Sequence, residues 1–218
     1  MSPTIGQLDE LLERAKTMGG SGGRRLLGIT GPPGAGKSTL ARLVADRLGP
    51  DLVRVVGMDG FHLSNAELAR LDRAQRKGAP DTFDVDGYVV LLHRLRHNRE
   101  PVIYAPLFDR SQEEPIAAGV SVPASVPLVV TEGNYLLTRE KGWERVRPLL
   151  DWCWYVEMDD TQRIARLEAR HHRHGKSLAE ARRWARESDQ RNAELVARTR
   201  DRADVVVRLP AGECPQSP

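Results

Sequence analysis

The sequence GPPGAGKS at positions 31–38 constrains this chain more than any other segment, because it fits the pattern G-x-x-x-x-G-K-[S/T]. Residues 26–30 before it form a short apolar run, as expected for a buried strand. Residues 39–48 after it carry apolar side chains at helical spacing. A strand, a glycine-rich loop and a helix in this order form a phosphate-binding loop. A chance match to this pattern would not be expected to have both a strand before it and a helix after it. The chain is therefore predicted to bind a nucleoside triphosphate.

Each residue type in this loop has a physical role. Glycines let backbone N–H groups turn towards phosphate oxygens, and the N-terminus of the following helix adds the positive end of its dipole. Lys37 is expected to reach the β- and γ-phosphates, and the hydroxyl of Ser38 is expected to bind Mg²⁺. The predicted contacts of ATP in this segment are Gly31, Gly34, Ala35, Gly36, Lys37, Ser38 and Thr39.

Size and composition favour one α/β domain in a reducing compartment. The chain has 218 residues, enough for a sizeable core but short for two domains. Its 33 basic and 30 acidic side chains leave a net charge of +3, which gives no signal for nucleic-acid binding. The two cysteines have no metal or redox spacing, and no apolar run has membrane-spanning length or signal-peptide character. We therefore expect a cytoplasmic protein without a membrane partner, and a homodimer is left open.

Alternating apolar strands and amphipathic helices predict the architecture. The expected strands are 26–30, 52–58, 102–104, 128–131, 152–158 and 205–209, and the expected helices are 5–17, 39–48, 86–98, 139–150, 160–174 and 178–200. This alternation implies an α/β fold, a P-loop NTPase-type parallel sheet with helices on both faces. We expect a single domain over 1–218, with an N-terminal helix and glycine-rich linker in 1–23, a helical lid in 160–176 and a flexible tail in 210–218.

Two carboxylates are expected at the tips of buried strands, where ligands of parallel α/β sheets gather. Asp59 follows the strand at 52–58, and Glu132 follows the strand at 128–131; each is directly followed by glycine. Asp59 is the candidate to take a proton from an acceptor hydroxyl, or else a turn or helix-capping residue. Glu132 either supports a magnesium ion directly or through water, or pairs with an arginine at the strand end.

A stripe of arginines at helical spacing supplies cations in the segment 161–176. Arg163, Arg166, Arg170 and Arg173 step by three, four and three residues, so they share one helical face. Such a stripe is typical of a lid that covers phosphates, and it is also compatible with a solvated face neutralised by glutamates. The neighbouring histidines at 171, 172 and 174 lack the spacing of metal ligands.

With these segments assembled, the chain resembles the P-loop kinases that include uridine kinase, phosphoribulokinase and type I pantothenate kinase. It is most similar to a bacterial subgroup labelled nucleoside/nucleotide kinase. The similarity spans roughly residues 24–208 and rests on motifs that occur in the family's order. These are VGMDGF at 56–61, RKGAPDTFD at 76–84, APLFDR at 105–110, EGNY at 132–135, the three arginines 163, 166 and 170, and ADVV at 203–206. The second of these is similar both to Lys-Gly-x-Pro of pantothenate kinase and to Pro-Asp-x-Phe-Asp of uridine kinase.

The resemblance implies ATP and Mg²⁺ as cofactors and a hydroxyl group of a small metabolite as the phosphoryl acceptor. It implies catalytic roles for Asp59, Lys37, Arg166 and Arg170, and a nucleotide contact for Arg163. Ser38 and Glu132 are the implied magnesium ligands. The residues expected around the acceptor are Phe61, His62, Asp84, Tyr104, Phe108, Arg110, Asn134 and Tyr135.

The acceptor's identity stays open at this point. Phe108 stands where uridine kinases have a tyrosine, and Glu113 lies near the position of their base-reading histidine, so a pyrimidine would lose two polar partners. Asp84 either holds a sugar hydroxyl or caps the helix that follows it. Arg110 and Tyr104 either face an anionic or polar acceptor, or they are packing or surface side chains without a role in binding. Nucleoside-, pantothenate- and sugar-like acceptors all remain candidates.

Two other functional classes share the phosphate-binding loop. A GTP-dependent switch or metallochaperone would need a guanine-reading N-K-x-D or T-K-x-D motif, and neither sequence occurs. An ATPase or ATP-binding regulator would have no small-molecule acceptor, and therefore no use for an acceptor-side base such as Asp59. The favoured interpretation is an ATP-dependent small-molecule kinase.

Overall fold

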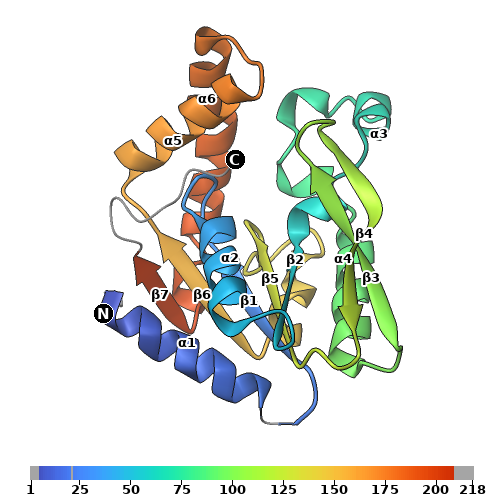
Figure 1. Cartoon of the computed structure of the whole chain (residues 1–218). Helices are drawn as coiled ribbons and strands as arrows, with labels where there is room; N and C mark the ends of the chain where they lie inside the picture. The colour runs from blue at the N-terminus through green and yellow to red at the C-terminus, as the bar shows by residue number, and fades with distance from the viewer. Residues whose placement is uncertain (1–4, 21, 209–218) are drawn as a thin grey trace.

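The central element of the fold is a five-stranded sheet in the order β2-β5-β1-β6-β7, in which every neighbouring pair is parallel (Figure 1). The computed structural model describes residues 5–20 and 22–208, with side chains described from residue 8 onward. The predicted tail at 210–218 lies outside the described residues. The strands are β1 (Arg25–Thr30), β2 (Val53–Gly57), β5 (Leu128–Gly133), β6 (Trp152–Glu157) and β7 (Val205–Arg208).

Helices cover both faces of this sheet, which confirms the predicted fold class. Helices α1 (Ile5–Gly19) and α2 (Lys37–Leu48) pack on one face, and α4 (Val85–His97) and α6 (Leu178–Ala197) on the other. Successive side chains of β1 point to opposite faces of the sheet. Leu26 packs in the core that contains α4 and α6, and Leu27 packs in the core that contains α1 and α2. Within the described residues, no helix combines the length and the apolar character needed to cross a membrane.

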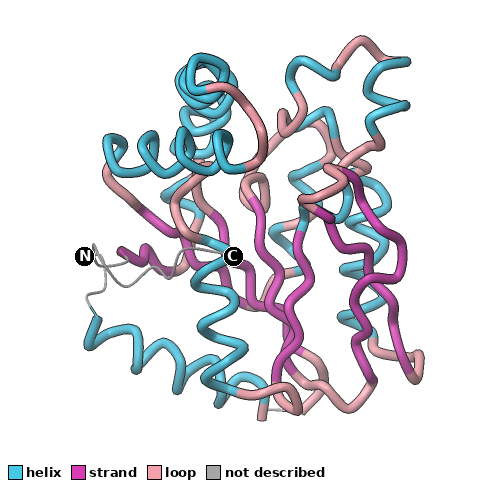
Figure 2. Tube along the Cα trace, turned by 45° about the horizontal axis from the view of Figure 1, so that its top comes forward, coloured by secondary structure: helices cyan, strands magenta, loops and turns pink. Residues whose placement is uncertain are grey.

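One predicted strand lies outside the parallel sheet. The segment expected at 102–104 extends to β3 (Val102–Asp109) and pairs antiparallel with β4 (Glu114–Pro123), a strand that the sequence pattern did not indicate. Figure 2 shows this two-stranded ribbon beside the central sheet. Only four residues join the two strands, and a parallel pair would need a long crossover. Strand β4 was not indicated by the hydrophobic pattern because half of its residues are exposed and only one is buried.

The prediction of a helix at 139–150 is wrong. The segment forms two separate 3₁₀ turns, Trp143–Arg145 and Arg147–Leu149. Gly142 adopts a left-handed conformation at φ 89°, and Pro148 has no backbone N–H to donate to a continuous helix. A short helix α3 (Asn65–Arg70) was missed, although Ser64 caps it by accepting a hydrogen bond from the N–H of Glu67.

The remaining helix, α5 (Asp160–Arg173), follows the predicted range within a residue and packs against α6. These two helices rise beyond the ends of β1 and β6, as Figure 1 shows. The loop after β1, the tips of β2 and β5, and the α5–α6 pair therefore meet at one edge of the sheet. This edge holds most of the residues singled out from the sequence.

Candidate active site

The loop between β1 and α2 has the backbone conformation of a phosphate cradle. Gly34 adopts φ +81°, and a Cβ atom there would lie 2.8 Å from Cγ of Leu167 on α5. Glycine is thus needed both for the turn and for the close approach of the lid helix. Helix α2 begins at Lys37, two residues earlier than predicted, so that its first N–H groups point into the loop.

Lys37 lies buried at the bottom of this loop. Its Nζ donates a hydrogen bond to the carbonyl oxygen of Pro32 at 3.0 Å, and only 8% of the residue is exposed. Burial lowers the pKa of Lys37 to about 8, against the opposing influence of the nearby carboxylates Glu132 and Asp59. The pKa of Lys37 therefore depends on the charge of any group that binds in the loop.

Ser38, in the first turn of α2, meets Glu132 near the end of β5. The Ser38 hydroxyl donates to Oε1 of Glu132 at 3.2 Å. Glu132 stands in register with Gly57 of β2 on its other side, which brings it to the tip of β2 as well. Burial, followed by the negative charge of Asp59, raises the pKa of Glu132 above its ordinary value. A hydroxyl and a carboxylate at this distance are a suitable pair of oxygen ligands for Mg²⁺.

Asp59 lies in the 3₁₀ turn Met58–Phe61 that follows β2. Its Oδ2 accepts a hydrogen bond from Nη2 of Arg110 at 3.0 Å, and 31% of its side chain is exposed. Burial alone would raise the pKa of Asp59, but His62, Arg110, Lys37 and Arg170 together outweigh it and lower the pKa. Asp59 is thus ionised at neutral pH, while its neighbour Glu132 is shifted in the opposite direction.

The glycine that follows each of these carboxylates is required by close packing. A Cβ on Gly60 would lie 2.4 Å from the carbonyl oxygen of Pro106, so the turn carrying Asp59 rests directly on β3. A Cβ on Gly133 would lie 2.5 Å from Cβ of Met58. The two strand tips therefore pack against each other and against the β3–β4 ribbon, which fixes the separation of Asp59 and Glu132.

The three lid arginines occupy different environments although they share one face of α5. Arg163 is fully buried: Nε donates to Asp160 at 2.9 Å, Nη1 to the carbonyl oxygen of Pro33 at 3.4 Å, and Nη2 to Gln190 of α6. Arg166 is half-buried. Arg170 lines the cavity that contains Lys37 and Asp59. Arg163 thus holds the phosphate-binding loop to α6, whereas Arg170 faces the site.

The acceptor side of the site is a cavity of about 340 Å³. The structure brings together there His62, Phe108, Arg110, Asn134, Lys37, Ser38, Asp59, Glu132 and Arg170. His62 contacts both Phe83 and Phe108 in tilted ring pairs, with ring centroids 4.0 and 4.7 Å away. These two contacts fix the aromatic wall next to Asp59.

Four residues expected around the acceptor lie outside the lining of this cavity. Asp84 caps α4 by accepting from the N–H of Gly87 at 2.8 Å, and 57% of Tyr104 is exposed on β3. Phe61 is buried against Tyr88, and the hydroxyl of Tyr135 donates to the carbonyl oxygen of Gly78 at 2.5 Å.

Several residues lining the cavity carried no assigned role from the sequence. His171 and Asp189 form a hydrogen bond of 2.7 Å between α5 and α6. Lys77, Lys176 and Trp184 also line the cavity, the last two from the α5–α6 turn and α6. The Lys-Gly-x-Pro sequence was a usable signal for Lys77, whereas nothing local marks Lys176.

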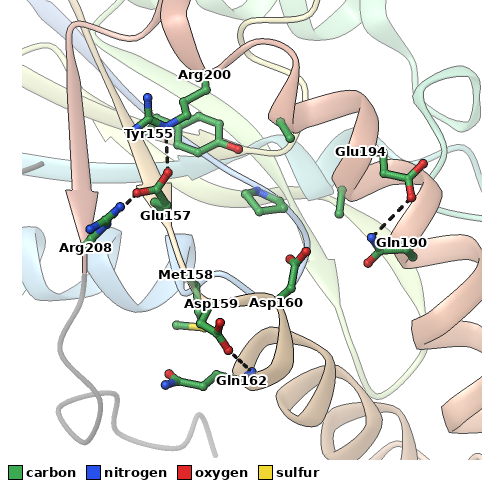
Figure 3. Close-up of a pocket in the computed structure, with 13 residues that line it drawn as sticks. Tyr155, Glu157, Met158, Asp159, Asp160, Gln162, Gln190, Glu194, Arg200 and Arg208 are labelled. Atoms are coloured by element: carbon green, nitrogen blue, oxygen red, sulfur yellow. Dashed lines mark hydrogen bonds and ion pairs between the residues drawn. The ribbon is translucent and has the colours of Figure 1, made fainter.

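A second and larger cavity, of about 720 Å³, is lined by Pro32 of the phosphate-binding loop and by residues of other elements (Figure 3). Its lining comes from β6, β7, α5 and α6, and its residues include Tyr155, Asp160 and Glu194. Glu157 at its wall is held by ion pairs with Arg200 at 2.7 Å and Arg208 at 2.6 Å. None of the predicted site residues lines this cavity, whereas Lys37, Asp59 and Arg170 line the smaller one.

Comparisons with known proteins agree with this geometry. A family model described as an AAA domain matches residues 27–194. A Schizosaccharomyces pombe protein named "Putative uridine kinase C227.14" is 33% identical over 178 residues, which cover 78% of this chain and 76% of that protein. A pantothenate kinase from Limosilactobacillus reuteri is 32% identical over 139 residues, 62% of this chain and 45% of its own length.

One solved structure extends the agreement to nearly the whole fold. A protein from Silicibacter sp. TM1040, described as a "putative fructose transport system kinase", superposes with a TM-score of 0.81 at 34% identity. The match covers 94% of this chain and 98% of that one. The names of these relatives are a putative uridine kinase, a pantothenate kinase and a putative fructose transport system kinase, so all three are named kinases and the names mention different molecules.

Proposed function

This chain belongs to the P-loop kinases related to uridine kinase and pantothenate kinase, and on that premise we propose that it transfers the γ-phosphoryl group of ATP to a hydroxyl group of a small metabolite. The observation that carries the proposal is the shared cavity of Lys37, Ser38 and Asp59. The first two residues belong to a phosphate-binding loop, and the third is an ionised carboxylate on the acceptor side.

The phosphates of ATP lie along residues 31–39, in reach of the N–H groups of the loop and of Lys37. Ser38 and Glu132 are the residues that would hold Mg²⁺, which neutralises charge on the phosphate oxygens when bound. Hydroxyl and carboxylate oxygens are the ligands this ion prefers, so the pair fits it.

Asp59 accepts the proton of the acceptor hydroxyl as its oxygen attacks the γ-phosphorus. Its lowered pKa keeps the carboxylate ionised at neutral pH, the form that a general base requires. Arg170, together with Lys37, stabilises the negative charge on the transferring group. Arg166 does not line the cavity, and its proposed contribution rests on its place on the same face of α5 as Arg170. Closure of the lid at 160–176 excludes water, which would otherwise compete with the acceptor.

The test is ADP release with Mg-ATP against nucleosides, pantothenate, and sugars or polyols. An acceptor-dependent rate that disappears in Asp59→Asn would support the kinase and name the acceptor class. A slow rate unchanged by any acceptor would point to an ATPase or regulator. A preference for GTP over ATP in the same assay would contradict the nucleotide assignment.

A further inference from the structure

Two lysines in the acceptor half of the cavity have no part in the mechanism above. Lys77 lies in the loop between α3 and α4, and Lys176 lies in the turn between α5 and α6. Both are half-buried and both line the cavity that contains Asp59. They approach it from opposite sides, since one belongs to the acceptor-side loops and the other to the lid.

Neither ammonium group has a carboxylate partner among the described residues. Nζ of Lys77 donates to Oδ1 of Asn65 at 2.7 Å and to the carbonyl oxygen of Glu113, and lies 5.1 Å from the ring centroid of Phe108. Nζ of Lys176 lies 4.9 Å from the ring centroid of Trp184. Amides, carbonyls and aromatic faces hold an ammonium in place without cancelling its charge.

The two lysines are close enough to affect each other. Burial is the main reason why the pKa of Lys77 lies below its ordinary value; Glu113 and Glu114 oppose this shift, and the charge of Lys176 adds to it. Bringing two positive charges together in a partly desolvated pocket is unfavourable unless an anion lies between them.

The other carboxylates of the cavity are already engaged. Asp59 pairs with Arg110, Glu132 accepts from Ser38, and Asp189 bonds to His171. Glu113 remains as the carboxylate next to Lys77, and its side chain is exposed. Among the lining residues without such a partner, the two lysines therefore outnumber the single carboxylate of Glu113.

The backbone that carries Lys77 is held by three donors from distant parts of the chain. The carbonyl oxygen of Gly78 accepts from the Tyr135 hydroxyl at 2.5 Å and from Nδ2 of Asn192 at 3.3 Å, and the Pro80 carbonyl accepts from Nε1 of Trp143 at 3.0 Å. A loop fixed in this way presents its lysine at a defined position, as a ligand contact requires.

We propose, on the premise that the Asp59 site is a kinase site, that the acceptor is a small hydroxy acid whose carboxylate or phosphate group lies between Lys77 and Lys176. Its hydroxyl group faces Asp59. The acceptor O–H bond gives its proton to Asp59, and the oxygen forms a bond to the γ-phosphorus. The bond from that phosphorus to the bridging oxygen breaks, and its electron pair leaves with ADP.

The first test compares acceptors in matched pairs that differ by the acid group: glycerate and glycerol, pantothenate and pantothenol, fructose 1-phosphate and fructose. We expect the acidic member of each pair to be the better substrate. The first two pairs test a carboxylate as the acid group, and the third pair tests a phosphate. Lys77→Gln and Lys176→Gln should each raise KM for that acceptor roughly tenfold or more, because each removes a charge-assisted contact, and leave KM for ATP unchanged. Lys16→Gln, on the exposed surface of α1, is the matched control.

The second test needs no substrate. Sulfate is titrated calorimetrically into the protein saturated with Mg-ADP, so that the phosphate-binding loop is occupied. We expect the variant with both lysines changed to glutamine to bind sulfate at least about tenfold more weakly than wild type and Lys16→Gln. Equal binding in all three proteins overturns the proposal.

The two proposals fail in different ways. Efficient turnover of neutral acceptors that is insensitive to Lys77→Gln and Lys176→Gln overturns the acidic acceptor and leaves the kinase intact. No acceptor-dependent ADP release, combined with sulfate binding that depends on both lysines, supports the anion site and overturns the kinase activity.

Discussion

Arg110 Nη2 lies 3.0 Å from Oδ2 of Asp59, and this contact joins the β3–β4 ribbon to the tip of β2 at the proposed base. A guanidinium at this distance stabilises the ionised carboxylate. Arg110 lies two positions after Phe108, in the segment where this chain differs from uridine kinases. The contact therefore holds one carboxylate oxygen of Asp59 against that segment. The ribbon therefore affects both the protonation state and the orientation of the base.

Asp59→Asn is expected to lower kcat by on the order of 100-fold or more, because the amide cannot accept the acceptor's proton. The Kd for Mg-ATP should stay within about twofold of wild type, since Asp59 lies on the acceptor side. A coupled ADP assay and nucleotide titration measure the two quantities. Asp51→Asn makes the same change on the exposed surface just before β2 and should be neutral. Full activity of Asp59→Asn would remove it from the mechanism.

The affinity for Mg-ATP should fall as pH rises above about 8. In the free protein Lys37 loses its proton near this pH, and only the protonated amine attracts the phosphates. Binding at higher pH must then take up a proton, so Kd should rise about tenfold per pH unit. Titration calorimetry in buffers of different ionisation enthalpy measures that uptake. Lys37→Arg stays charged and should show no such slope; a flat wild-type profile would contradict the assignment.

The lid arginines should separate into one that supports structure and two that support catalysis. Arg163→Ala is expected to cost about 2 kcal/mol of unfolding free energy, because the buried guanidinium holds Pro33 and Gln190. For a chain of this size that corresponds to a fall in Tm of roughly 4–8 °C.

Arg166→Ala and Arg170→Ala should leave Tm nearly unchanged and lower kcat more than they weaken ATP binding, by about 100-fold or more for Arg170. Thermal unfolding and steady-state kinetics on the three variants distinguish the roles. A wild-type Tm with lost nucleotide affinity in Arg163→Ala would instead make Arg163 a nucleotide ligand.

Gly60→Ala is expected to lower kcat while leaving ATP binding intact. The added Cβ would lie 2.4 Å from the Pro106 carbonyl, so the turn must move and Asp59 moves with it. A displacement of about 1 Å at a catalytic group costs on the order of 100-fold in rate. Gly20→Ala, where the nearest atom is 3.6 Å away, controls for the loss of a glycine. Unchanged kcat in Gly60→Ala would show that the turn tolerates the shift.

The parts of this fold that could be predicted from sequence depend on local pattern. The phosphate-binding loop, the sheet strands and the two strand-tip carboxylates each follow from neighbouring residues and from the rule that ligands gather where parallel strands end. The β3–β4 ribbon could not be predicted, because exposed strands lose the alternation that marks them.

Long-range packing limits what the sequence shows about individual side chains. Helical spacing puts Arg163 and Arg170 on one face of α5. It does not show that the first lies over the phosphate-binding loop and the second over the cavity. Lys77 and Lys176 are about a hundred residues apart, and their approach depends on how the lid turn folds back towards the loop at 77–80.

The two hydrogen bonds to the Gly78 carbonyl affect how a protein of this kind can change its acceptor. Their donors, Tyr135 and Asn192, lie outside the loop they hold, so these hydrogen bonds do not depend on the side chains at positions 77 and 79. A lineage can then exchange the side chain facing the acceptor without losing the fold or the phosphate-transfer machinery. Selection for a new acceptor could then act on the side chain at position 77 while the hydrogen bonds to the Gly78 carbonyl stay in place.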